Sequence, residues 1–388
     1  MTKQKSSDAT TVAINHQVIA ILAGCVIAAV SIRTLDKIQA ARVAELTTGQ
    51  LTTALGPDDA HVICVDLESS VPCLADHQGW QGETILWLGN SQLPTINQQQ
   101  PGDVTMVDLL HRKLRPDGQY VFGIAPPNAN LQEHYVLLEY FAPKIQPNTL
   151  LLPVFYDDLR ETGVRPQLSG VFESSTATES LTATAIGKVL INESTANQTA
   201  ADPASKLSRS TMDQSESAIN DFLSGMWRYW EHRGTYRALL FIKMHHLRNT
   251  IFRVDPQSVR KMIPARYDRN MQALDAIVAS CQEHEITLLL YIPPIRTDVP
   301  IPYDIAAYED FKKMLRQYAA NRGLMFADYE DVVATEEWGT KVSTAMGGGQ
   351  ELDFMHFTFP GHQKLASQIE RTLRNEMPSL FQTVGETN

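Results

Sequence analysis

Residues 85–93 read ILWLGNSQL, a short apolar run that ends in glycine, asparagine and serine. The apolar part has the length and composition of a strand that is buried on both faces. Two interpretations fit the residues that follow it. They form a plain turn, or they hold a serine at the carboxyl end of a sheet, where it can act as a nucleophile.

Similar apolar runs recur along the chain. Strands are predicted at residues 84–88, 120–124, 149–155, 286–292 and 324–329, with helical stretches between them and a further short strand candidate at 62–67. Continuous apolar strands that alternate with helices indicate a parallel sheet covered on both faces. We therefore predict a three-layer α/β/α domain with a parallel sheet of about five strands.

Changes in composition suggest the domain boundaries. We predict an N-terminal tail and membrane anchor over residues 1–35, a stalk and lead-in over 36–82, and one domain over 83–388. An insertion at 169–265 interrupts this domain. Its first part, 169–217, is rich in serine, threonine and alanine and is predicted to be flexible, whereas 218–254 is predicted to be helical. Deleting residues 176–215 is accordingly predicted to leave the fold intact.

The N-terminal segment predicts a single-pass anchor. Residues 18–32, VIAILAGCVIAAVSI, carry no charge, and with the preceding residues they reach the roughly 20 needed to cross a bilayer. A buried core helix is the alternative. A lipoprotein cleavage box at 22–25 is less favoured than an uncleaved signal anchor, because the apolar run continues beyond Cys25. Lysine and arginine flank both ends of the segment, so charge does not decide its orientation.

Overall composition excludes several classes of protein. The 388 residues carry a formal net charge of −11, which argues against a nucleic-acid partner. Four cysteines exclude a disulfide-dense scaffold, although Cys64 and Cys73 could form a disulfide in an oxidising compartment or remain as two thiols. Adjacent His245 and His246 would point about 100° apart on a helix. No ligand cluster accompanies them, so neither a metal nor a cofactor is predicted.

A second motif lies near the C-terminus, where Asp353 and His356 stand three positions apart before a predicted helix. Together with Ser91 at the end of an early strand, this pair resembles the pattern of the SGNH (GDSL-like) hydrolase superfamily. The resemblance covers roughly residues 83–168 and 266–374. It implies that Ser91 is a nucleophile, that His356 is its base, and that Asp353 orients and stabilises the imidazole.

The resemblance also implies donors for an oxyanion. One is the Ser91 N–H, at the start of a helix predicted to follow it. The family's second block points to the Gly123 N–H, or to a residue of the loop that follows. The family's third block is missing, and Asp157-Asp158 stand in its place, with Asp157 read as a helix N-cap. The side chain of Asn128 is the substitute candidate for that missing donor.

One further position departs from the family. The aspartate that usually precedes the serine is Asn90 in this chain. Because that side chain takes no direct part in proton transfer, replacing Asn90 by aspartate is predicted to be tolerated.

The anchor, the degenerate Gly-x-Ser block and the retained Asp-x-x-His resemble a membrane-associated branch of the superfamily. That branch includes alginate-type polysaccharide O-acetyltransferases and the D-alanyl transfer protein of teichoic acid. The resemblance implies an extracytoplasmic serine O-acetyltransferase or esterase at the cell membrane, acting on a cell-surface glycan beside a multi-pass membrane acyltransferase. The alternative is a non-catalytic module that binds glycan or scaffolds such a complex; the missing third block favours it, and the retained Ser91, Asp353 and His356 oppose it.

Overall fold

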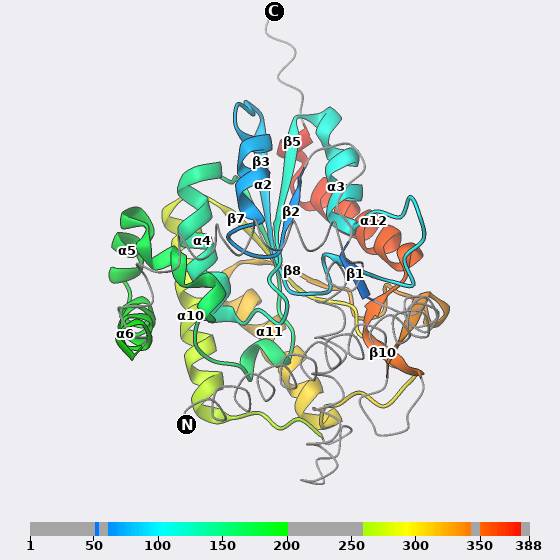
Figure 1. Ribbon diagram of the computed structural model, residues 1–388. Coiled ribbons are helices and arrows are strands. Elements are labelled where there is room, and N and C mark those ends of the chain that lie inside the picture. Colours follow the sequence, from blue (N-terminus) through cyan, green and yellow to red (C-terminus); the bar gives the residue numbers. More distant parts are fainter. Residues whose placement is uncertain (1–50, 54–60, 201–258, 343–349, 382–388) are drawn as a thin grey trace, which may run out of the picture. The chain divides into compact units, whose positions relative to one another are not determined.

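A parallel sheet of six strands forms the centre of the described domain (Figure 1). The computed structural model describes residues 51–53, 61–200, 259–342 and 350–381. In sheet order the strands are β2 (Ile63–Cys64), β5 (Gln119–Ile124), β3 (Glu83–Leu88), β6 (Thr149–Pro153), β7 (Thr287–Ile292) and β8 (Met325–Asp328). The predicted parallel α/β architecture is confirmed, with six strands where about five were expected.

Helices cover both faces of this sheet, which gives the three layers. Two of them, α3 (Met106–Leu114) and α12 (Phe359–Glu376), lie together on one side, and α4 (Leu131–Ile145) and α10 (Pro264–Glu283) lie on the other (Figure 1). A further helix, α11 (Ile305–Arg322), precedes β8. Both α3 and α4 begin at capping boxes, in which the side chains of Thr105 and Asn130 accept a backbone N–H of the first turn.

Strand β3 places the serine segment in the middle of the sheet. It pairs in parallel with β5 on one side and β6 on the other. Ile85 to Leu88 are fully buried, as expected for a strand covered on both faces. Trp87 donates its indole N–H to the hydroxyl of Tyr291 on β7 at 2.9 Å, which satisfies two polar groups in the core.

The predicted lead-in contributes to the domain itself. Strand β2 pairs with β5, and α2 (Ser70–His77) follows it. A disulfide joins Cys64 on β2 to Cys73 on α2, so the alternative of two free thiols is excluded. The boundary predicted at residue 83 is therefore wrong, because the sheet extends back to Ile63. All described residues belong to one compact unit formed by residues 49–202 and 254–388.

Residues 169–200 of the insertion are ordered and packed, which corrects the prediction of a flexible tract over this part of 169–217. Residues of this tract form a 3₁₀ helix (Pro166–Glu173), α5 (Ser175–Thr182) and α6 (Ala185–Ala200). Although the tract is polar on average, it contains apolar residues at helical spacing. Ala177 and Leu181 lie four positions apart on α5, and Ile186 and Leu190 lie four positions apart on α6. All four side chains are buried. This spacing makes one apolar face on each helix, which average composition does not reveal. Residues 201–217 and the helix predicted at 218–254 lie outside the described residues.

This packing reverses the expectation for the insertion. Replacing Leu181 by alanine should lower the free energy of unfolding by about 2–5 kcal/mol, because the fully buried side chain would leave a cavity. Val189 on the neighbouring helix is 42% exposed, and its replacement by alanine should change stability by less than about 0.5 kcal/mol. Urea denaturation of the two variants measures both values. Equal stabilities would mean that α5 does not pack on the domain.

Two small antiparallel pairs complete the described structure. Strand β1 (Leu51–Thr53) pairs with β4 (Thr95–Asn97), and β9 (Trp338–Val342) pairs with β10 (Gln350–Phe357). The Asp-x-x-His motif lies on β10, directly before α12. No helix in the described ranges is long and apolar enough to cross a membrane, and the predicted span at 18–32 lies outside those ranges.

Candidate active site

Ser91 lies in a tight turn just beyond the carboxyl end of β3. Gly89 donates its N–H to the carbonyl of Ile124 and so extends the pairing of β3 with β5. The side chain of Asn90 then accepts the N–H of Gln92, and the Asn90 carbonyl accepts that of Leu93. These bonds form a turn over residues 91–94, after which β4 begins. The helix predicted to follow Ser91 is absent from this stretch.

The turn depends on the glycine before it. A Cβ atom at residue 89 would lie 2.3 Å from Cδ1 of Leu93, which folds back over the strand end. A side chain at this position would push Leu93 away. Since Asn90 and Ser91 lie between Gly89 and Leu93, the position of Ser91 depends on the close approach that Gly89 allows.

Ser91, His356 and Asp353 form one chain of hydrogen bonds. Ser91 Oγ lies 3.0 Å from His356 Nε2, and His356 Nδ1 lies 3.0 Å from Asp353 Oδ2. Both distances fall in the range expected of a nucleophile, its base and the group that orients the base. The serine is partly buried, the imidazole is mostly buried, and Asp353 is only 1% exposed. The structure therefore brings together the three residues predicted from the two distant motifs.

The surroundings of Asp353 keep its carboxyl group ionised. Burial alone would raise its pKa, but the hydrogen bond and charge of His356, the Met355 N–H and the charge of Lys341 outweigh that effect and hold the pKa below its usual value. Oδ1 accepts the backbone N–H groups of Met355 and His356 at 2.9 and 3.2 Å. A carboxylate held in this way fixes which imidazole nitrogen carries the proton.

The three predicted oxyanion donors lie in different surroundings. Gly123 lies inside β5 and donates its N–H to the carbonyl of Val62 at 2.7 Å, so this N–H is occupied by the sheet, and its assignment as a donor is wrong. Asn128 lies exposed in the loop after β5, with a φ of 56°, and among the described residues no hydrogen bond joins it to Ser91. The Ser91 N–H is not donated to any described residue.

The two aspartates in place of the third block have separate roles. Asp157 forms ion pairs with Arg160 and Arg260 and accepts the Tyr303 hydroxyl at 2.9 Å, so its role is an ion-pair centre and not the predicted N-cap. Asp158 is buried and accepts the Phe155 N–H at 2.9 Å.

Asp158 also lies against the side chain of Asn90, next to the candidate nucleophile. Burial raises the pKa of Asp158 well above its usual value, the nearby Asp157 raises it further, and the Phe155 and Asn90 hydrogen bonds oppose the shift. The asparagine that departs from the family pattern therefore contacts a buried acid. This contact was not visible from the sequence, because about seventy residues separate the two positions.

Gln92 connects the serine turn to the histidine strand. Its buried amide donates to the carbonyls of Pro294 and Met355 at 2.9 and 2.8 Å. Met355 precedes His356, so this one side chain joins the residue after the nucleophile to the residue before the base. Sequence reasoning missed Gln92, which follows glycine, asparagine and serine and carried no distinguishing signal.

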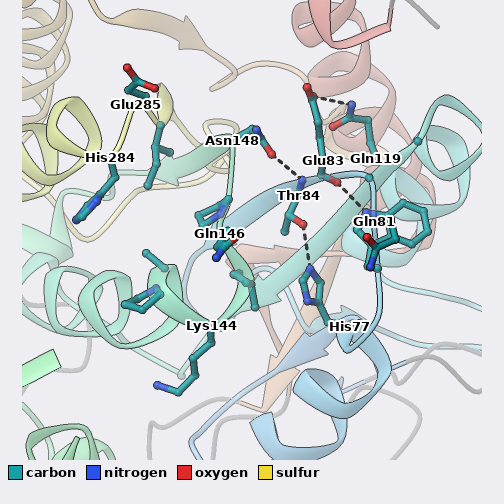
Figure 2. A pocket seen from close by; sticks show the side chains of 18 of the residues that line it. His77, Gln81, Glu83, Thr84, Gln119, Lys144, Gln146, Asn148, His284 and Glu285 are labelled. Atoms are coloured by element: carbon teal, nitrogen blue, oxygen red, sulfur yellow. Dashed lines mark hydrogen bonds between the residues drawn. The ribbon is translucent and has the colours of Figure 1, made fainter. Parts of the chain in front are cut away.

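A wide cavity of about 1450 Å³ lies at the opposite edge of the sheet, near the amino ends of its strands (Figure 2). None of the three proposed catalytic residues lines it. Several of its polar groups are paired with one another: His77 Nε2 with Thr84 Oγ1, Asn148 Oδ1 with the Thr84 N–H, and Gln119 Nε2 with Glu83. Open α/β sheets place their reactions at the carboxyl ends of strands, where Ser91 lies.

No family model matches the sequence, and no curated protein matches it either. Solved structures share the general fold at low similarity. A protein described as an acylhydrolase from Bacteroides fragilis is 10% identical, with a TM-score of 0.38, over 80% of this chain and 97% of its own. A GDSL-like lipase from Bacteroides thetaiotaomicron is 8% identical, with a TM-score of 0.34, over 76% and 89%. An α/β hydrolase enzyme from the metagenome of Lake Arreo, Spain, is 11% identical, with a TM-score of 0.38, over 75% and 94%. At these scores the comparison carries no argument about function, which rests on the site itself.

Proposed function

We propose that the protein is a serine-dependent acyl-transfer enzyme of the SGNH type. The observation that carries the proposal is the hydrogen-bond chain from Ser91 through His356 to Asp353 at the carboxyl end of the central strand. The same three groups in this order activate a serine hydroxyl in unrelated hydrolase folds. The more particular proposal is a membrane-anchored O-acetyltransferase or esterase that acts on a cell-surface glycan.

The geometry supports a two-step reaction. His356 Nε2 removes the proton of Ser91 Oγ as the oxygen attacks an ester carbonyl, and Asp353 stabilises the imidazolium that forms. The tetrahedral intermediate expels the alcohol, which takes the proton from His356, and leaves an acyl-Ser91. In the second step His356 deprotonates a glycan hydroxyl or water, whose oxygen attacks the acyl carbonyl; the bond to Ser91 Oγ breaks, and this oxygen takes the proton back from His356.

Oxyanion stabilisation in this proposal depends on the Ser91 N–H. That group has no acceptor among the described residues and lies on the attacking residue itself. Each such donor contributes about 3–4 kcal/mol to transition-state stabilisation in a serine hydrolase. Asn128 remains the proposed second donor, and it would have to approach Ser91 when substrate binds.

The experiment that tests the proposal is covalent labelling by a fluorophosphonate probe. The full-length chain in its native membranes should gain one adduct, which peptide mapping places on Ser91. Labelling elsewhere, retained in the Ser91→Ala variant, would move the nucleophile. Absence of any adduct would contradict the proposed enzymatic function and would leave the non-catalytic module as the alternative.

That second candidate is a non-catalytic module that binds glycan or scaffolds a membrane acyltransferase complex. The observation in its favour is the Gly123 N–H, which is committed to the sheet and leaves one fewer oxyanion donor. A labelling-negative protein that still binds a cell-surface glycan in a pull-down would favour it.

We also propose an extracytoplasmic location for the domain. The apolar run at 18–32 and the Cys64–Cys73 disulfide both support it, because such bonds persist in oxidising compartments. Of four cysteines, two are in the disulfide, which leaves two for alkylation.

The chain extracted under denaturing conditions should accordingly take two maleimide labels before the disulfide is reduced and four labels after its reduction. The Cys64→Ser/Cys73→Ser double variant should take two in both states. Four labels on the wild type without reductant would place the domain in a reducing compartment.

A further inference from the structure

A buried asparagine contacts both the acid and the base of the site. Asn97 ends β4, and its side chain is fully buried. Its Nδ2 donates to Asp353 Oδ2 at 3.3 Å and to the His356 carbonyl at 3.4 Å. The negative charge of Asp353 fixes the orientation of the Asn97 amide. The opposite orientation would place the amide oxygen Oδ1 against a carboxylate, and both groups only accept hydrogen bonds.

We propose that Asn97 is a positioning residue, which fixes the Asp353 carboxylate and, through it, the imidazole of His356 relative to Ser91. This proposal rests on the proposed function and adds a residue to it. Asn97 lies six positions after Ser91, so one short segment supplies both the nucleophile and the group that orients the distant acid. Gln92 in the same segment joins it to Met355.

Strand β4 is itself held in place. His362 on α12 donates its Nε2–H to the Thr95 carbonyl at 3.1 Å and accepts the Met106 N–H on Nδ1 at 3.1 Å. Burial lowers the pKa of His362 to about 3, so it stays neutral and can make both bonds. The asparagine therefore stands on a strand that is tied to α12 and α3.

A glycine on β9 makes room for this side chain. A Cβ atom at Gly339 would lie 2.1 Å from Cγ of Asn97. Arg296 Nη1 donates to the Gly339 carbonyl at 3.3 Å, which restrains the backbone there. Glycine is needed here for close approach, and any larger residue would displace the Asn97 amide.

The first test is Asn97→Asp, which keeps the size of the side chain but replaces the donor with a carboxylate next to Asp353. We expect kcat for a small acetyl ester to fall about 10- to 100-fold with KM unchanged, because a charge-assisted hydrogen bond is replaced by repulsion. Two adjacent carboxyls retain a proton to higher pH. The charged groups that otherwise influence Asp353 are His356 and Lys341, so the acid limb of kcat/KM should move upward in pH.

Two further variants separate the effect of position from that of charge. Gly339→Ala should reproduce the loss of kcat without adding a charge, because it displaces the Asn97 amide. Gln100→Glu, at an exposed position three residues after Asn97, should leave kcat and the pH profile unchanged.

A proton NMR measurement makes the test independent of turnover. The wild type should show a low-field resonance for the His356 Nδ1 proton, identified by its loss in His356→Gln, and this resonance should shift or broaden in Asn97→Asp and Gly339→Ala. If Asn97→Asp left both the resonance and the pH profile unchanged, the positioning role would be overturned. This would hold even if kcat fell because the variant is less stable. If the wild type showed the resonance but hydrolysed no ester, the proposed function would be contradicted. The role of Asn97 could still be measured, because the resonance does not depend on turnover.

Discussion

Replacing Ser91 by alanine should lower kcat for a small acetyl ester by about 10⁴- to 10⁶-fold, because the oxygen that forms the acyl-enzyme is lost. His356→Ala should cause a loss of similar size, since an unassisted hydroxyl is a weak nucleophile. The Ser91→Ala/His356→Ala double variant should be no slower than either single variant, because the residues act as a unit. Steady-state kinetics in native membranes measures all three values.

Matched controls lie on the same chain. Ser175→Ala and His284→Ala change exposed residues of the same types outside the site and should leave kcat unchanged. Additive losses in the double variant would show that serine and histidine act in separate steps. A Ser91→Ala variant with wild-type turnover would exclude the acyl-serine route altogether.

Asn90→Asp should unfold or strongly destabilise the protein, which reverses the expectation from the family pattern. Asn90 is buried, its Oδ1 accepts the Gln92 N–H, and its side chain lies against the buried acid Asp158. Aspartate at this position would place two carboxyl groups together away from water. The free energy of unfolding should fall by about 3 kcal/mol or more at pH 8, the scale of an uncompensated buried charge.

The pH dependence has a definite sign. In the folded variant, the two carboxyl groups at positions 90 and 158 share a proton up to a raised pKa. In the unfolded chain each carboxyl group loses its proton near the ordinary pKa of aspartate. Between the ordinary and the raised pKa the folded state therefore binds more protons than the unfolded state. Stability therefore falls as pH rises, and Asn90→Asp should be closer to wild type at pH 5 than at pH 8. Urea denaturation at both pH values measures the difference.

An exchange of the two residues gives the sharpest control. The double variant Asn90→Asp/Asp158→Asn restores one amide facing one carboxyl group and should recover most of the lost stability. Asn375→Asp, an exposed change of the same kind, should cost less than about 0.5 kcal/mol. A fully stable single variant Asn90→Asp would mean that residues 90 and 158 are not in contact.

The parts of the protein that could be predicted from sequence are those with local signals. Each main strand carried a continuous apolar run, and the order of strands and helices was enough to indicate a parallel sheet. Ser91 and the Asp353–His356 pair each occupy the end of a predicted element or the residues just before one. The resemblance of the two motifs to the SGNH pattern, and neither motif alone, was the basis for expecting them together.

The errors come from contacts between distant residues. The position of Gly123 matched a family block, but only strand register shows that the carbonyl of Val62, just before β2, accepts its N–H. The insertion was judged by average composition, whereas its packing depends on Leu181 and Leu190 at particular helix positions. Asn97 stood in the polar run TINQQQ and was not singled out, although its amide contacts Asp353 from 256 residues away.

The separation of 265 positions between Ser91 and His356 also imposes a delay during biosynthesis. At about 5–20 residues per second, a ribosome needs roughly 13–50 s to go from the serine to the histidine. During that interval the nascent chain carries a serine with no base, so its hydroxyl has only the reactivity of an ordinary alcohol. In the proposed mechanism the chain is acylated by this route only after β10 has been made and has brought His356 beside Ser91.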